Sequence, residues 1–165
     1  ALPISKAPTL YAEFVNKEGL FRAVLDRYIS RFAARHEALL FDDEKTVDRA
    51  LRDYFTAVAT CFTSKETPAG CFMINTSAAL AASSTDIATT VKSRHAMQEQ
   101  TLTHFLQQRQ LRGELPPDGD VHQLAQFLNC ILQGMSISAR EGADFTKIMQ
   151  IAETTLRLWP QVLQR

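Results

Sequence analysis

The sequence predicts an all-α protein, and three observations support this prediction. Only 6 Gly and 6 Pro interrupt the 165 residues, which favours long helices over many short strands. Apolar residues recur three and four positions apart along most of the chain, the spacing of a helix with one buried face. No stretch alternates apolar and polar residues for long enough to form a half-buried strand.

The first predicted element is a short helix that ends near Phe14, with Leu10 and Phe14 four residues apart on its buried side. Its solvent side carries Pro8, Thr9 and Tyr11. Asn16 then has the side chain to cap a second helix whose first residue is Lys17. A cation and several backbone N–H groups would point the same way at that helix start, which is a geometry that binds phosphate.

The second helix should continue to about Leu40, because apolar residues repeat at helical spacing from Phe21 onward. We expect residues 42–44 to form a turn and the start of the next helix, which carries the cleanest apolar stripe of the chain. The stretch 67–70, which contains Pro and Gly, should end that helix.

The second half of the chain predicts four more helices. A short apolar helix should span about residues 71–82, and residues 83–85 should cap a long polar helix that ends near Gly113. Asp120 and Gln123 resemble a capping box at the start of the next helix, which Gly142 should end. Asp144 should cap the last helix.

Residues 7–21 carry the most specific pattern of the chain. They resemble the recognition helix and the following helix start of the tetracycline-repressor (TetR) family. The matching positions are Pro8, Thr9, Leu10, Tyr11, Phe14, Lys17, Glu18, Leu20 and Phe21. So many fixed positions in so short a span are far more specific than a lone dipeptide; the alternative is an amphipathic helix pair in some other bundle.

The resemblance implies a partial helix-turn-helix DNA-binding domain over residues 1–21 and a helical ligand-binding and dimerisation domain over residues 22–165. It also implies a ligand-responsive transcriptional regulator, most often a repressor, that binds a palindromic operator as a homodimer. Two recognition helices would then read half-sites about 34–36 Å apart. The implied DNA contacts are Ala7, Pro8, Thr9, Tyr11 and Lys17. The alternative function is an all-α dimeric small-molecule-binding or adaptor module without DNA binding.

The distribution of charge supports DNA binding only at the amino-terminal end of the chain. The formal net charge is zero, so an affinity for nucleic acid cannot be argued from the whole molecule. Residues 1–35 hold six Lys and Arg against three Asp and Glu, a local charge of plus three. We therefore expect the basic surface to be confined to the amino-terminal end.

The amino terminus departs from the family pattern. A complete TetR-like domain has two further helices before its recognition helix, whereas only six residues precede Ala7. We expect that a stretch between Lys6 and Ala7 is missing from this sequence. The alternative is a truncated protein, which would not bind DNA because a lone recognition helix has no scaffold.

The last two predicted helices have wide apolar arcs, which need cover on two sides. In TetR-like proteins these helices pair with the same two of a second subunit, so the resemblance implies a homodimer. The alternative is that the same residues complete the core of the subunit. The expected interface residues are Phe127, Ile131, Met135, Ile148, Ile151, Leu158 and Trp159.

The helices between the two ends of the chain should enclose the effector site that the family resemblance implies. Aromatic walls with a few polar groups suit a small, mostly apolar effector. The candidate residues are Phe55, Phe62, Phe72, Asn75, His95, Gln98, Phe105 and Asn129. Each of them alone is more often ordinary core or surface, and Asn75 stands out because an amide in an apolar run needs a partner.

No pattern predicts catalysis, a metal site or a cofactor. The four His lie on different predicted helices, and HxxxH, CxxC and Gly-rich phosphate-loop spacings are absent from the sequence. The three Cys are expected to be reduced and mostly buried, with Cys71 at a helix start either an inert thiol or an oxidant sensor. Without an apolar run of about 18 residues or a signal peptide, we expect a cytoplasmic protein.

Overall fold

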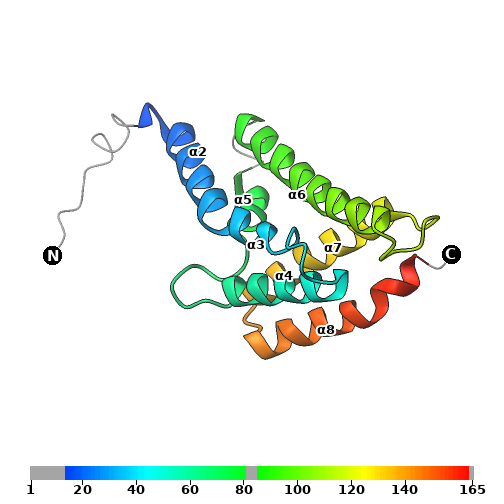
Figure 1. Cartoon of the computed structure of the whole chain (residues 1–165). Helices are drawn as coiled ribbons and strands as arrows, with labels where there is room; N and C mark the ends of the chain where they lie inside the picture. The colour runs from blue at the N-terminus through cyan, green and yellow to red at the C-terminus, as the bar shows by residue number, and fades with distance from the viewer. Residues whose placement is uncertain (1–13, 81–84, 164–165) are drawn as a thin grey trace.

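The computed structural model describes residues 14–80 and 85–163, which are folded as a bundle of helices (Figure 1). The elements in chain order are α2 (Lys17–Tyr28), the π-helical turn η1 (Ile29–Ala33), α3 (Ala34–Ala38), α4 (Val47–Phe62), α5 (Phe72–Leu80), α6 (Thr85–Leu111), α7 (Val121–Arg140) and α8 (Phe145–Val162). Within these two ranges there is no strand, so the all-α prediction is confirmed. None of the helices described there combines the length and the apolar character that a membrane crossing requires.

Helix α2 continues through η1 into α3, so the predicted helical stretch from Lys17 to about Leu40 is confirmed. The five residues of η1 form a wider turn, which rotates the faces of α3 relative to those of α2. Figure 1 shows this segment at one edge of the molecule, with the start of α2 lying away from α8.

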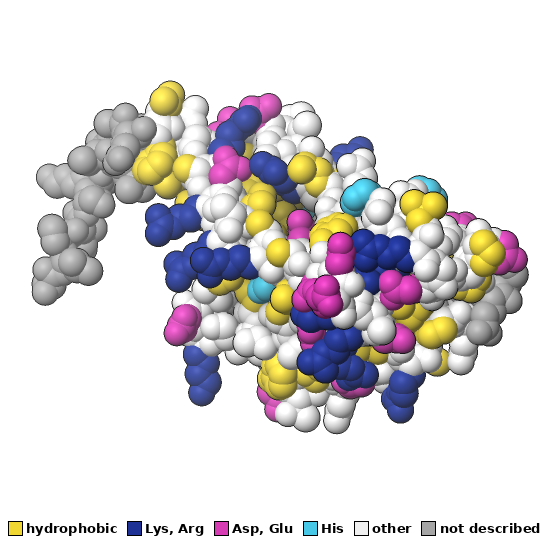
Figure 2. All heavy atoms as spheres, in the orientation of Figure 1, with side chains coloured by type: hydrophobic (Ala, Val, Ile, Leu, Met, Phe, Trp, Pro, Cys, Tyr) yellow, Lys and Arg dark blue, Asp and Glu magenta, His cyan; other side chains and the backbone are white. Residues whose placement is uncertain are grey.

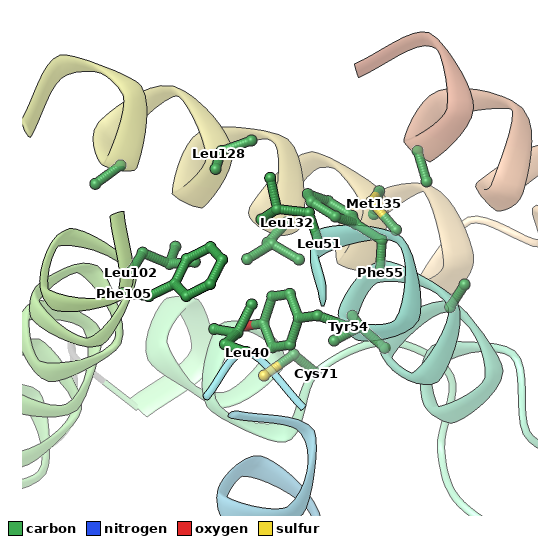
Figure 3. Packing of buried hydrophobic residues seen from close by; sticks show 14 of the residues in the cluster. Leu40, Leu51, Tyr54, Phe55, Cys71, Leu102, Phe105, Leu128, Leu132 and Met135 are labelled. Carbon is green, nitrogen blue, oxygen red and sulfur yellow. The ribbon is translucent and has the colours of Figure 1, made fainter. Parts of the chain in front are cut away.

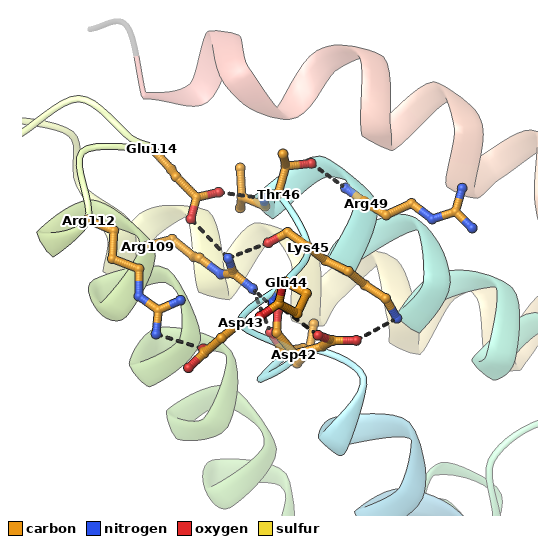
Figure 4. Close-up of polar contacts among 11 residues, drawn as sticks. Asp42, Asp43, Glu44, Lys45, Thr46, Arg49, Arg109, Arg112 and Glu114 are labelled. Carbon is orange, nitrogen blue, oxygen red and sulfur yellow. Dashed lines mark hydrogen bonds and ion pairs between the residues drawn. The ribbon is translucent and has the colours of Figure 1, made fainter.

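Helix α4 begins later than predicted. Its first residue is Val47, and the side chain of Thr46 caps it by accepting a hydrogen bond from the Arg49 N–H. Residues 42–44 belong to the connection between α3 and α4, where the carbonyls of Leu40 and Asp42 accept hydrogen bonds from Arg109 of α6 (Figure 4). The acidic residues therefore precede the helix, because tertiary hydrogen bonds hold their backbone in a turn.

The core is centred on the apolar stripe of α4, which packs against α7 and α8. Figure 3 shows Tyr54 and Phe55 of α4 among Leu102 and Phe105 of α6 and Leu132 of α7. Each of these five side chains is at most 2% exposed.

The predicted break between α4 and α5 is confirmed at Gly70. Its φ of +83° suits glycine, and a Cβ there would lie 2.6 Å from the carbonyl oxygen of Ser136 on α7. The next residue, Cys71, donates its backbone N–H to Ser136 Oγ at 2.7 Å. The start of α5 is thereby fixed against α7.

The predicted ends of the last helices are also confirmed. Asp120 Oδ1 accepts a hydrogen bond from the Gln123 N–H at 3.0 Å, and Asp144 Oδ1 accepts one from the Lys147 N–H at 2.9 Å. Gly142, with a φ of +98°, follows the last turn of α7.

Candidate DNA interface and ligand site

The start of α2 has the geometry that the sequence predicts. Asn16 has an extended backbone, and its side-chain oxygen accepts a hydrogen bond from the Gly19 N–H at 2.9 Å. Lys17 is therefore the first helical residue, and its side chain is exposed. The positive end of a helix and an ammonium group together attract an anion such as a phosphate.

The turn that leads into α2 is tightly packed. Gly19 lies so close to Phe14 that a Cβ would be 2.0 Å from the Phe14 carbonyl oxygen. That same oxygen accepts a hydrogen bond from the Asn16 N–H at 2.8 Å. Val15 between them is 86% exposed and has a φ of +67°, a strained conformation for a β-branched residue. The backbone before α2 thus meets the helix at a fixed angle.

The other predicted DNA contacts, Ala7, Pro8, Thr9 and Tyr11, lie outside the described residues, as does the junction between Lys6 and Ala7. Their roles and the missing stretch remain predictions. The boundary expected after residue 21 falls inside α2, which runs unbroken from Lys17 to Tyr28.

Basic side chains follow the helical segment after Lys17. Arg27, Arg31 and Arg35 are exposed and four residues apart, and Lys and Arg side chains project along this edge in Figure 2. Lys and Arg side chains also lie over other parts of the same face in Figure 2, so the basic surface is present at this end but is not confined to it.

Two ion pairs join α2 to the first part of α6. Arg22 contacts Asp86 at 2.5 Å, and Asp26 contacts Arg94 at 3.1 Å. Phe21 of α2 also stacks on Phe72 of α5, with ring centroids 5.7 Å apart. Helix α2 is therefore connected to two helices of the predicted effector domain.

A polar layer interrupts the core on α6. The inward stripe of this helix contains buried Val91, Leu102 and Phe105, but the positions between them are His95 and Gln98. Gln98 donates from Nε2 to the hydroxyl oxygen of Tyr54 on α4 at 3.5 Å. Figure 3 shows the Tyr54 ring directed from α4 towards the residues of α6.

Helix α7 adds Asn129 to this layer. Asn129 is 5% exposed, and its Nδ2 donates to the Glu99 carboxylate at 3.4 Å. Its Oδ1 is buried without a hydrogen-bond partner, and so is Nδ1 of His95. Burial lowers the pKa of His95 below its usual value, so its imidazole is neutral at pH 7.

Asn75 on α5 is partly satisfied. Its Nδ2 donates to the Ala69 carbonyl at 2.8 Å, while its buried Oδ1 has no partner. The predicted need for a partner is therefore half met.

The aromatic residues predicted for the effector site lie in the core. Phe55 and Phe105 are at most 1% exposed, Phe62 is 6% exposed, and Phe72 is half-buried. The structure pairs Gln98 with Tyr54 and Asn129 with Glu99, and both pairs include neighbouring residues of α6. His95 lies one helical turn before Glu99 on the same helix, and its Nδ1 has no hydrogen-bond partner. Their role towards an effector remains a prediction.

Cysteine burial is mixed, so the expectation of mostly buried thiols holds for Cys71 alone. Cys71 is buried and accepts a hydrogen bond from the Tyr28 hydroxyl, with oxygen and sulfur 3.5 Å apart. Cys61 is half-buried, and burial raises the pKa of its thiol. Cys130 is exposed on α7. Burial also raises the pKa of Tyr28 far above its usual value, so this hydroxyl stays protonated.

The seven predicted interface residues fall into two groups. Met135, Ile148 and Trp159 are at most 4% exposed and belong to the core of the single chain. Phe127, Ile131, Ile151 and Leu158 instead line one surface groove of about 530 Å³ between α7 and α8. Leu158 is 46% exposed there.

Sequence reasoning missed Tyr54 and Glu99 as members of the polar layer. Sequence spacing places Tyr54 on the apolar stripe of its helix, although its hydroxyl needs a buried partner. Glu99 follows Gln98 on α6, and the break in the Val91-to-Leu102 stripe was the available signal. Across residues 14–80 and 85–163, no three His, Cys, Asp or Glu side chains are grouped so that they could hold a metal ion.

Comparison with known proteins gives a consistent result. Residues 46–154 match a family model described as the tetracyclin repressor-like C-terminal domain. The chain is 71% identical over 160 residues to the HTH-type transcriptional repressor ComR of Escherichia coli K12, covering 97% of this chain and 76% of ComR. It is 26% identical over 145 residues to the repressor BdcR of the same organism, covering 88% of this chain and 68% of BdcR.

A solved structure matches the fold over nearly the whole chain. It is the TetR family transcriptional regulator CifR, in the form of a cysteine mutant complexed with 26-bp double-strand operator DNA. The TM-score is 0.83 at 25% identity, and the match covers 94% of this chain and 81% of CifR.

Proposed function

Because the chain belongs to the tetracycline-repressor (TetR) family of transcriptional regulators, we propose that it represses transcription. It binds palindromic operator DNA as a homodimer and leaves the DNA when a small effector binds. The observation that carries this proposal is the start of α2, where the Asn16 cap presents an exposed Lys17 at the positive end of a helix. The name of ComR and the operator DNA in the CifR structure support it.

In this proposal DNA contacts divide into two kinds. Lys17 and the start of α2 hold a backbone phosphate, which fixes the position of the protein on the duplex. Pro8, Thr9 and Tyr11, with Ala7, face the groove and its flanking backbone. Leu20 and Phe21, which are half-buried and buried, hold α2 in place and do not contact DNA.

The homodimer forms through the groove between α7 and α8. Four apolar side chains, Phe127, Ile131, Ile151 and Leu158, line it together with polar residues of α8. A second copy of the chain would cover these apolar groups and place two α2 helices on one side of a duplex.

Release follows from the connection between α2 and α6. The Arg22–Asp86 and Asp26–Arg94 ion pairs make a displacement of α6 move α2 as well. An effector that binds better to the displaced state shifts the population towards it and lowers the affinity for DNA. This function requires no catalysis and no cofactor. A protein that acts on operator DNA would work in the cytoplasm.

Titration of a palindrome near the chain's own gene, followed by fluorescence anisotropy at several salt concentrations, tests the proposal. Lys17→Ala should weaken DNA binding. It should also reduce the steepness of the plot of log binding constant against log salt concentration by about one, because one phosphate contact is lost. Lys17→Arg should retain most of the slope, and Lys65→Ala, an exposed lysine between α4 and α5, should bind like the parent.

Two results would contradict the proposal. An unchanged salt slope in Lys17→Ala would remove Lys17 from the interface. A parent homodimer that binds no such palindrome would favour the alternative function, a ligand-binding or adaptor module.

A further inference from the structure

The polar layer of α6 is poorly satisfied for a buried site. Its two hydrogen bonds, Gln98 to Tyr54 and Asn129 to Glu99, measure 3.5 and 3.4 Å. Ordinary N–H to O bonds have lengths of about 2.9–3.0 Å. Elsewhere in the same core, the buried Ser136 hydroxyl accepts its bond at 2.7 Å.

Unpartnered atoms confirm that this layer lacks hydrogen-bond donors. Asn129 is 95% buried, and its Oδ1 accepts no hydrogen bond from any described residue. His95 Nδ1, one helical turn before Glu99 on α6, is buried and unpartnered as well. Buried polar atoms of native proteins are nearly always paired, so unpaired ones in one layer indicate a missing partner.

The missing partner should carry positive charge. Glu99 contributes a half-buried carboxylate to the layer, and none of the Lys and Arg side chains of the described residues pairs with it within 4.0 Å. Its recorded hydrogen bond comes from the neutral Asn129 amide.

We propose that Glu99 of α6 and Asn129 of α7 together bind the ammonium group of an organic amine. This inference rests on the proposed function, since it names the chemical class of the effector. The ammonium N–H groups donate to Asn129 Oδ1 and to the Glu99 carboxylate. The carboxylate excludes anionic effectors of similar shape by repulsion.

Calorimetric titration of the parent protein with two matched pairs tests the charge preference. The pairs are benzylamine with benzoate, and tryptamine with indole-3-acetate. At least one amine should bind at least about tenfold more tightly than its carboxylate, since a charge-assisted hydrogen bond is at stake. Failure of both amines to bind, or equal binding of the carboxylates, would overturn the inference.

Two substitutions separate a ligand site from a structural one. Glu99→Gln should lose about tenfold or more of the amine affinity without lowering the midpoint of thermal unfolding. Asn129→Leu should raise this midpoint, because it removes a buried unpaired acceptor, and should also lose the amine response. The matched control Ser136→Ala removes a satisfied hydroxyl and should lower the midpoint. An Asn129→Leu variant that is destabilised like Ser136→Ala would show a structural amide and overturn the inference.

The DNA titration keeps this inference distinct from the proposed function. Salt-dependent operator binding without amine binding would overturn only the amine site. Amine binding by a protein that binds no operator would overturn the repressor function and leave the site in place.

Discussion

Single residues set the geometry at the start of α2. The Asn16 side chain replaces a backbone acceptor for the Gly19 N–H, and Gly19 has no side chain to collide with the Phe14 carbonyl. The absence of a Cβ at this contact is what allows the turn to close. The close approach of Phe14 to α2 therefore depends on one glycine.

Gly19→Ala should weaken operator binding about tenfold or more, because its Cβ would displace Phe14, the residue that leads into the proposed DNA contacts. The rest of the helical domain should unfold at an unchanged temperature, since Gly19 lies at its edge. Anisotropy titration and thermal unfolding measure the two effects, with Ala34→Ser on exposed α3 as the control. Parent-like DNA affinity in Gly19→Ala would show that the contact is not rigid.

At the scale of secondary-structure elements, the buried guanidinium of Arg109 joins α6 to the connection between α3 and α4. Arg109 of α6 is 2% exposed and donates to the carbonyls of Leu40, Asp42 and Lys45 at 2.6–3.2 Å (Figure 4). It also forms an ion pair of 2.9 Å with one oxygen of the Glu114 carboxylate. The other oxygen accepts a hydrogen bond from the N–H of Val47, the first residue of α4. Burial raises the pKa of Glu114, but the hydrogen bonds from Arg109 and the backbone outweigh it and lower the pKa overall.

Arg109→Met should reduce the free energy of unfolding by about 3 kcal/mol, because it leaves three backbone carbonyls and the partly exposed Glu114 carboxylate without their donor. Arg112→Met, the same change three residues later, should cost less than about 1 kcal/mol, since its ion pair with Asp43 is exposed. Urea unfolding measures both. Equal losses in the two variants would show that the burial of Arg109 has no special importance.

At the scale of the whole molecule, the proposed DNA-binding site and the proposed dimer interface are formed by different helices. In Figure 1 the start of α2 lies away from α8, one of the two helices whose residues line the groove. The polar layer joins α6 to α4 and α7, and α6 is also the helix that forms ion pairs with α2. A ligand bound at the polar layer can therefore change the position of α2 relative to the proposed dimer interface without contacting DNA.

Leu158→Glu should convert the homodimer into a monomer, because it places a charge in an apolar groove that a second copy would bury. Leu111→Glu is the matched control, since Leu111 is 81% exposed at the end of α6 and outside this groove. Sedimentation equilibrium gives the mass of each variant. A Leu158→Glu protein that stays dimeric, or a parent that is monomeric at micromolar concentration, would contradict the proposed interface.

Much of the fold was predictable from local signals. The caps at Asn16, Asp120 and Asp144, and the glycines at 70 and 142, act within a few residues of the helix ends that they define. The apolar stripe of α4 is likewise a property of sequence spacing. These features follow from the sequence because their interactions span four residues or fewer.

The start of α4 and the polar layer depended on the tertiary structure. Residues 42–44 had the composition of a helix start, yet Arg109, more than sixty positions later, holds the backbone before Thr46 in a turn. The pairing of Tyr54, Glu99 and Asn129 likewise joins three helices that no sequence spacing relates. By itself the sequence determined the helices, their caps and the family pattern, since each of these is local. Only the packing of helices decided which apolar residues stay exposed and which buried polar atoms lack a partner, because both depend on neighbours that are distant in the chain.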